Sequence, residues 1–272
     1  LKDGITSNTF GTIEEDVFRR DFSLNALFYD PLEQVVVDYV EGMKDIREKL
    51  IKPVIPLKVI FTDDPVRMIR AVKYAAATGF SLPWLLRRRI RREAPLLASV
   101  SPSRLTEEML KIIRSPCAAV IVESLEAYGL YGSLQAGASR LMRERPSFKA
   151  RYLKTLAGLD IRNAGLTGSS PGEALAALVR DYLEETVEWD AGTVENYQAA
   201  FALARSFVLP INPPRVELDR AVRLVFAEHG HPIKRSHAAE RGRAPEGETR
   251  KRRRRRRTVS GTDPRAQGPA GD

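Results

Sequence analysis

Apolar and polar positions recur at a helical period in residues 14–30, the first strongly patterned stretch of the chain. The apolar side chains would wrap most of a helix circumference, so the pattern predicts a largely buried helix. Arg19, Arg20, Asp21 and Asn25 interrupt it, although an unpaired buried charge is costly. Asp21 and Asn25 are four residues apart and would share a face, with Arg20 beside them. This arrangement suits a polar ligand; a purely structural Arg–Asp pair at a helix start is the alternative.

The next segments show other periodicities. The run at 32–39 is rich in β-branched residues and predicts a strand. Residues 42–50 predict a short helix, and residues 51–62, with two prolines, predict an extended segment.

From residue 63 onward the pattern is helical. A basic amphipathic helix is predicted at 83–92, with Trp84, Leu85 and Ile90 as its apolar contacts. The other predicted helices cover 101–113, 116–130, 138–160, 171–188, 193–208 and 214–227. The fold class is therefore predicted to be mainly α. Residues 228–272 hold few large apolar groups and are predicted to be disordered.

The helix predicted to begin near residue 63 carries a second polar cluster. Asp63 suits the N-cap position, and Pro65 suits the first turn, where its missing N–H costs little. Asp63 and Asp64 lie four and three residues before Arg67, so all three side chains can converge. A carboxylate beside a guanidinium matches the edge of a nucleobase, because one accepts and the other donates hydrogen bonds. The alternative is a capped helix with an internal ion pair.

Charge is concentrated at the C-terminus. The net charge is +9, and residues 233–272 contain 13 lysines and arginines against five acidic residues, a net charge of +8. Such a block binds polyanions, although a nuclear localisation signal, non-specific adhesion or an inert tail would also fit. The basic helix at 83–92 could likewise meet RNA phosphates or be a solvated face. The predicted RNA contacts are Arg87, Arg88, Arg91, Arg252, Arg253, Arg254, Arg255, Arg256 and Arg257.

The rest of the composition excludes several classes of protein. The single cysteine, Cys117, rules out a disulfide framework and a cysteine-rich metal site, and it fits a reducing, cytoplasmic environment. No apolar run approaches the roughly 20 residues that a membrane-spanning helix needs. There is no signal peptide, and the chain begins at Leu1 rather than Met, so we expect a fragment or a misassigned start.

Two segments resemble motifs of the class II nucleotidyltransferases, the family of bacterial poly(A) polymerases and tRNA nucleotidyltransferases. Residues 19–27 are similar to the Arg-Arg-Asp-Phe-Thr-(Val/Ile)-Asn-Ala-Leu motif, with Ser23 in place of Thr. Residues 63–71 are similar to Glu-Asp-Pro-x-Arg-(Met/Leu)-(Leu/Ile)-Arg-Ala, with Asp63 in place of Glu. The resemblance covers residues 8–135 well and later residues loosely.

The resemblance implies roles for these residues. The first motif would contact the ribose and phosphates of an incoming nucleotide, and Asp64 and Arg67 of the second would contact the edge of its base. The implied nucleotide-binding set is Arg19, Arg20, Asp21, Asn25, Asp63, Asp64, Arg67 and Arg70.

The resemblance also implies a domain order and a reaction. Residues 1–50 would be the C-terminal remnant of an α/β head, 51–135 a helical neck, 136–227 an RNA-binding helical body and 228–272 a basic tail. The expected activity is transfer of AMP from ATP to RNA 3′ ends by a monomer, with Mg²⁺ as the cofactor. The family's metal-binding Gly-Ser and Asp-x-Asp strands are not found before Arg19, so we expect them upstream of Leu1 and expect this chain to be catalytically incomplete.

Two other functions stay open. A CCA-adding tRNA nucleotidyltransferase belongs to the same superfamily and would incorporate CTP before ATP. A non-catalytic RNA-binding protein that lost its head would bind RNA without binding ATP. The basic tail favours the poly(A) polymerase.

Overall fold

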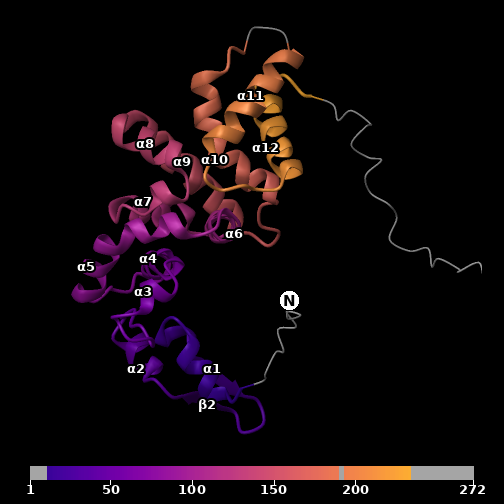
Figure 1. Ribbon diagram of the computed structural model, residues 1–272. Coiled ribbons are helices and arrows are strands. Elements are labelled where there is room, and N and C mark those ends of the chain that lie inside the picture. Colours follow the sequence, from indigo (N-terminus) through magenta and orange to yellow (C-terminus); the bar gives the residue numbers. More distant parts are fainter. Residues whose placement is uncertain (1–10, 190–192, 234–272) are drawn as a thin grey trace, which may run out of the picture. The chain divides into compact units, whose positions relative to one another are not determined.

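The computed structural model describes residues 11–189 and 193–233 and is mainly helical, as the sequence predicts (Figure 1). The chain divides into two units, residues 1–233 and 234–272, and the described residues all belong to the first. The basic tail, Arg252–Arg257 included, and the prediction of its disorder therefore lie outside the described residues. The elements are α1 (Ile13–Arg19), η1 (Ser23–Asn25), β1 (Leu27–Asp30), β2 (Val35–Asp38), α2 (Gly42–Arg47), α3 (Ile60–Asp63), α4 (Val66–Thr78), α5 (Trp84–Glu93), η2 (Ala94–Ser99), α6 (Pro102–Ile113), α7 (Ala118–Ala127), η3 (Tyr131–Ser133), α8 (Ala136–Glu144), α9 (Pro146–Asn163), α10 (Pro171–Thr186), α11 (Thr193–Phe207) and α12 (Arg215–Glu228).

Residues 14–30 do not form one buried helix, and that prediction is wrong. α1 begins at a Thr12 capping box and ends at Arg19, because Arg20 and Phe22 are extended. The cause lies outside the segment. The N–H of Ser23 donates to the carbonyl of Lys52 at 2.9 Å, and the N–H of Val54 donates to the backbone carbonyl of Asp21 at 3.1 Å. These bonds to a distant segment replace helical ones.

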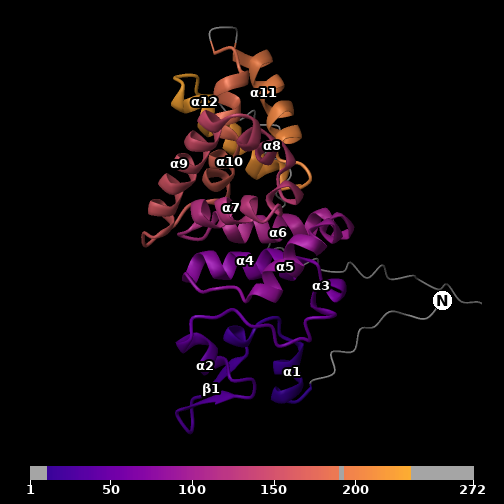
Figure 2. The ribbon, with the colours of Figure 1, turned by 90° about the vertical axis from the view of Figure 1, so that its left-hand side faces the viewer.

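The end of the same stretch forms a β-hairpin (Figure 2). β1 pairs antiparallel with β2, with Leu27 opposite Asp38 and Asp30 opposite Val35. The strand predicted at 32–39 is thus present but shorter, because residues 31–34 form the turn. Residues 27–30 and 35–38 are rich in β-branched and aromatic side chains, which favour a strand. Strand pairing therefore prevails over the helical period of residues 27–30.

The segment before α4 also differs from its prediction. Residues 60–63 are helical as α3, not extended. Asp63 closes α3 and caps nothing; Pro65 takes the N-cap position of α4 without a side-chain hydrogen bond. The Oδ1 atom of Asp64 accepts instead from the N–H of Val66 at 3.1 Å. The carboxylate that bonds to the start of α4 is therefore that of Asp64, one residue after the predicted Asp63.

The core joins helices from the whole first unit. α4 packs against α7, α7 against α9, and α10 against α9 and α12. The helix predicted at 138–160 is two helices, α8 and α9, because Arg145 is extended before Pro146. The helices predicted at 171–188, 193–208 and 214–227 are present as α10, α11 and α12.

The basic helix α5 is oriented differently from its prediction. Leu86 and Ile90 are buried, whereas Trp84 is 60% and Leu85 57% exposed. The buried pair is spaced by four residues and makes a narrow apolar stripe. The remainder of α5 presents mostly arginines to solvent, so this surface is available to a partner.

Candidate functional site

One cavity of about 370 Å³ collects both polar clusters singled out in the sequence. Seven of the eight predicted nucleotide-binding residues line it. The lining consists of Arg19, Arg20, Asp21, Asn25, Asp64, Arg67, Arg70 and Tyr74. Asp63 is the exception, since it is exposed at the end of α3 and does not line the cavity.

Asp21 is the buried carboxylate of the cavity, with only 4% of the residue exposed. Its Oδ1 atom accepts from the N–H of Phe22 at 2.9 Å and from the side-chain amide of Asn25 at 3.2 Å. Its Oδ2 atom lies 3.0 Å from Nε of Arg70. The pairing of Asp21 with Asn25 survives the loss of the predicted helix, because η1 turns the chain back over the same span.

Arg20 is held by several acceptors at once. Its guanidinium bonds to Oδ2 of Asp16 at 2.8 and 3.1 Å and to the carbonyl of Asn25 at 2.7 Å. It also lies 4.7 Å from the ring centre of Phe28, within cation–π range. These contacts fix the side chain while 39% of it stays exposed. Arg19 is freer, with 73% of its side chain exposed.

Asp16 is a partner of Arg20 and Arg19 that the sequence analysis missed. Hydrogen bonds from Arg20 and Arg19 lower the pKa of Asp16 from its ordinary value, outweighing the small effect of burial. The spacing of Asp16 four residues before Arg20 is the signal that could have identified it.

In the second cluster, the carboxylate of Asp64 and the guanidinium of Arg67 are each held by a different residue. Nη2 of Arg104, on α6, bonds to Oδ2 of Asp64 at 2.7 Å. Nη1 of Arg67 donates to the carbonyl of Ile60 at 3.2 Å. Asp64 and Arg67 thus both reach the cavity, as predicted, but each is oriented by a residue outside the predicted set. The pattern Arg-Leu-x-Glu-Glu at 104–108 contains Arg104, yet its pairing with a residue 40 positions earlier has no local signal.

Tyr74 is the other residue that the sequence analysis missed. Its hydroxyl accepts from Nη2 of Arg70 at 3.3 Å, and its ring meets Phe22 edge-on at 6.0 Å. Tyr74 follows Arg70 by four residues on α4, a spacing that places both on one face.

The lining combines four arginines with two carboxylates, a net charge of +2. Guanidinium groups bind phosphate oxygens in a bidentate manner, and a carboxylate accepts from an exocyclic amino group. An aromatic ring adds a surface for a sugar or base. The cavity therefore suits a ligand that is anionic at one end and carries hydrogen-bond donors at the other.

The predicted RNA-contacting arginines of α5 are exposed. Arg87, Arg88 and Arg91 all face solvent. Arg88 lies 5.5 Å from the ring centre of Trp84, and Arg91 lies 4.9 Å from that of Tyr128. Arg88 and Arg91 form no ion pair with any residue that the structure describes, so they retain their donors for phosphates.

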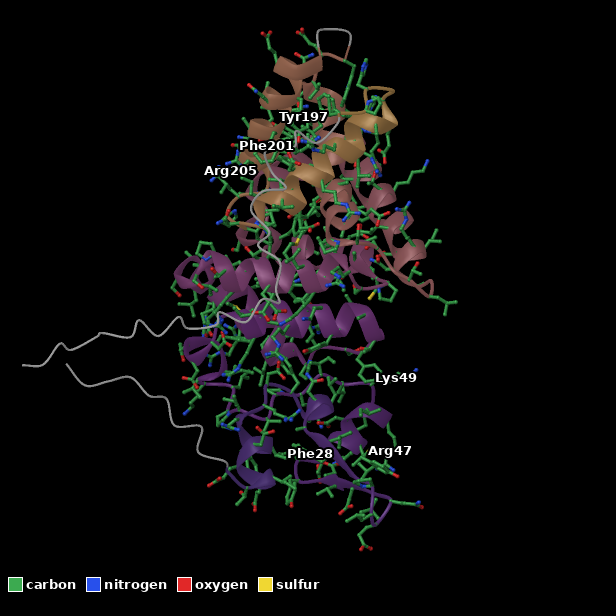
Figure 3. All side chains as sticks on the ribbon, turned by 90° about the vertical axis from the view of Figure 1, so that its right-hand side faces the viewer. Phe28, Arg47, Lys49, Tyr197, Phe201 and Arg205 are labelled. Carbon is green, nitrogen blue, oxygen red and sulfur yellow. The ribbon has the colours of Figure 1, made fainter. Side chains whose placement is uncertain are left out.

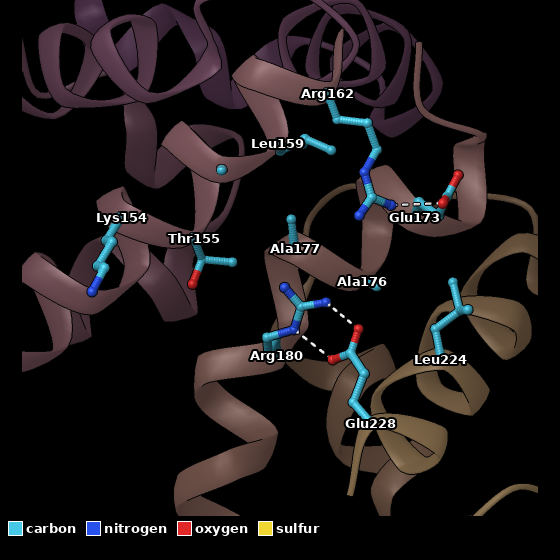
Figure 4. Close-up of a pocket in the computed structure, with 11 residues that line it drawn as sticks. Lys154, Thr155, Leu159, Arg162, Glu173, Ala176, Ala177, Arg180, Leu224 and Glu228 are labelled. Atoms are coloured by element: carbon cyan, nitrogen blue, oxygen red, sulfur yellow. Dashed lines mark hydrogen bonds and ion pairs between the residues drawn. The ribbon is translucent and has the colours of Figure 1, made fainter. Parts of the chain in front are cut away.

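A further cavity of about 380 Å³ lies among α9, α10 and α12 (Figure 4). Its charges are satisfied internally. Arg162 bonds to Glu173 at 2.7 Å, and Arg180 makes two bonds to Glu228 at 2.6 and 2.9 Å. These pairs leave mainly Lys154 to attract a ligand, so this cavity is a weaker candidate.

Metal ligands and membrane spans were sought over residues 11–189 and 193–233. No three His, Cys, Asp or Glu side chains gather there as a metal site. Within the same ranges, no helix has the length and apolar character needed to traverse a membrane.

Comparison with known proteins gives two family matches. Residues 3–52 match the model of the poly A polymerase head domain. Residues 79–139 match the model described as the probable RNA and SrmB-binding site of polymerase A. The two matches flank the segment that carries Asp64, Arg67 and Arg70.

The chain is also similar to individual proteins. The chain is 34% identical to poly(A) polymerase I of Haemophilus influenzae over 211 residues, 76% of this chain and 46% of that protein. It is 38% identical to a CCA-adding enzyme of Geobacillus thermodenitrificans over 119 residues, 44% of this chain and 29% of that protein. A solved structure, the Bacillus stearothermophilus CCA-adding enzyme in complex with CTP, has 26% identity and a TM-score of 0.47, covering 80% of this chain and 60% of that one. The chain thus spans less than half the length of these curated relatives.

Proposed function

This chain belongs to the class II nucleotidyltransferase family, and on that premise we propose that its cavity at Asp21 holds ATP and that the intact protein adds AMP to RNA 3′ ends. In such a reaction the 3′-hydroxyl oxygen of RNA bonds to the α-phosphorus, and pyrophosphate leaves. Mg²⁺ would screen the triphosphate when bound. No residue of this chain is assigned to it.

The observation that carries the proposal is the convergence of residues 19–25 with residues 64–74 on one cavity. Arg19 and Arg20 supply donors for phosphate oxygens, and Asp21 with Asn25 suits the ribose hydroxyls. At the other end, Asp64 accepts from the exocyclic amino group of adenine while Arg67 donates to a ring nitrogen. Arg70 and Tyr74 support Asp21.

RNA is the proposed second substrate. The exposed arginines of α5 lie within the residues that match the RNA-binding model. Contacts from Arg87, Arg88 and Arg91 to phosphates would position the RNA without reading its sequence. The six arginines at 252–257 would add affinity that falls steeply with salt.

A CCA-adding activity is the second candidate, and the identity to the Geobacillus thermodenitrificans enzyme favours it. The poly(A) polymerase relative covers a larger share of this chain, 76% against 44%, so adenylation leads. Incorporation of CTP before ATP on a tRNA that lacks its 3′ end would select the CCA-adding activity.

The test is Arg67→Ala in the intact protein, with primer extension measured for each nucleotide. We expect discrimination among nucleotides to relax more than RNA affinity falls. Arg88→Ala is the matched control, because it removes an arginine from α5 and should weaken RNA binding while nucleotide preference stays. An unchanged ATP preference in Arg67→Ala would contradict the base-contacting role.

A further inference from the structure

A groove of about 720 Å³ lies where α11, the proline-rich loop 208–214 and α12 meet the start of α6. Its volume is about twice that of the cavity at Asp21, which we call the nucleotide cavity. Apart from Pro102, its lining lies outside residues 79–139, the segment that matches the RNA-binding model. Phe201 and Arg205 are four residues apart on α11, and Figure 3 shows them in succession with Tyr197 along that helix. Arg215 contributes from the first turn of α12.

The groove combines an aromatic surface with positive charge. The guanidinium of Arg215 lies 5.6 Å from the ring centre of Phe201. Arg205 and Arg215 are exposed, and neither forms an ion pair with any other residue that the structure describes. Among the residues that the structure describes, no Asp or Glu lines the groove. Uncompensated arginines beside a ring match a nucleotide, since the phosphate pairs with the cation and the base stacks on the flat groups.

α6 connects this groove to the nucleotide cavity. Pro102 lines the groove, and Arg104, two residues or about 3 Å of helix axis further on, bonds to Asp64. Oγ1 of Thr106, which is 6% exposed, accepts from the N–H of Asn212 at 2.8 Å and so ties the loop to the same helix. An RNA chain that ends at the cavity beside Asp21 can therefore continue over the start of α6 into the groove.

We propose that this groove binds an unpaired nucleotide of the RNA substrate, with its base against Phe201 and Arg215 and its phosphate on Arg205. The proposal rests on the proposed function, because that function makes RNA the ligand. Every nucleobase has a flat face, so the contact is tolerant of sequence, as the growing end of a tailed RNA requires.

The test measures the binding of a short 5′-fluorescein oligoadenylate to the full chain. Fluorescence anisotropy gives the affinity at several salt concentrations. Arg205→Ala should lower affinity and reduce the slope of log affinity against log salt by about 0.7, the value for one lost phosphate contact on a single strand. Phe201→Leu should lower affinity about fivefold or more and leave the slope unchanged, because stacking releases no counterions.

Arg220→Ala is the matched control. Arg220 is an exposed arginine of α12 that does not line the groove. It removes the same charge from the same helical body, so its affinity and salt slope should stay close to those of the wild type. Since Phe201 is half-buried, circular dichroism and thermal unfolding check its folding, and Arg205→Ala provides the test at a surface position.

The outcomes separate this proposal from the proposed function. If Arg205→Ala and Phe201→Leu bind as tightly as the wild type while Arg88→Ala binds more weakly, the groove is not an RNA site. The α5 surface and the proposed function would then still stand. Equal effects of Arg205→Ala and Arg220→Ala would also overturn the groove proposal, because they would reveal only general charge. A wild-type chain with no affinity for oligoadenylate would overturn both.

Discussion

Arg70 and Asp21 form an ion pair across 49 positions of sequence, with 3.0 Å between Nε and Oδ2. Asp21 belongs to the first polar cluster and Arg70 to the second. The Asp21 side chain is 3% exposed and the Arg70 side chain 34%. The pair joins α4 to the segment after α1 and so assembles the cavity. The Oδ1 atom of Asp21 accepts from Phe22 and Asn25 while its Oδ2 atom faces Arg70, so Asp21 joins the two clusters structurally.

Loss of this pair should destabilise the fold. We expect Arg70→Ala to lower the free energy of unfolding by about 2 kcal/mol, because it leaves a buried carboxylate without its cation. Combining it with Asp21→Asn should cost less than the sum of the two single changes. Urea unfolding of the four proteins measures this coupling. Arg19→Ala, which breaks an exposed pair with Asp16, is the control and should leave stability unchanged. Strict additivity of Arg70→Ala and Asp21→Asn would contradict the pairing.

Arg104 should influence nucleotide choice through Asp64. Since Arg104 orients the carboxylate from α6, we expect Arg104→Ala to reduce the preference for ATP over CTP by about tenfold, or ~1.4 kcal/mol. The ratio of kcat/KM values in primer extension by the intact nucleotidyltransferase measures it. Arg114→Ala removes an exposed arginine just after the end of the same helix and should preserve the ratio. A preserved ratio in Arg104→Ala would show that Asp64 keeps its orientation alone.

Stability should fall in acid through Glu108. Burial raises the pKa of Glu108, but hydrogen bonds and charge from Lys73 and Lys111 outweigh it and hold the pKa below its ordinary value. The ionised group therefore contributes stability above its unfolded pKa, and this contribution disappears as the pH falls through the lowered folded pKa. We expect the wild type to be more stable than Glu108→Gln near neutral pH and the difference to shrink in acid. Denaturant unfolding across that range tests it, and a constant difference would refute the assignment.

Two glycines should respond oppositely to alanine. A Cβ at Gly42, the first residue of α2, would lie 2.5 Å from the carbonyl oxygen of Ser23, so Gly42→Ala should cost about 1–3 kcal/mol. Gly158 is within α9 with nothing inside 4 Å of that position, so Gly158→Ala should gain about 0.5–1 kcal/mol. Thermal unfolding of both variants measures the contrast. Equal shifts of the same sign would rule out the close approach of η1 to α2.

Much of the fold follows from local patterns. The amphipathic spacing identified α10, α11 and α12 within a few residues, because an apolar stripe at a 3.6-residue period has few other ways to be buried. The same logic failed for residues 14–30. Their apolar side chains fit a helix, but backbone pairing with residues 52–54 and the β1–β2 ladder decided the conformation. Such pairing is non-local, so no window of sequence contains it.

The sequence by itself determined which residues gather at one cavity: the residue types and spacing at 19–25 and 64–70 predicted seven of the side chains that line it. Only the tertiary structure decided how these side chains are held. The pairing of Arg70 with Asp21, the support of Asp64 by Arg104 and the exclusion of Asp63 all depend on where α4 and α6 pack. Periodicity assigns a residue to a face of its own helix. It cannot specify which distant charge meets that face, because that choice is made by the packing of the whole core.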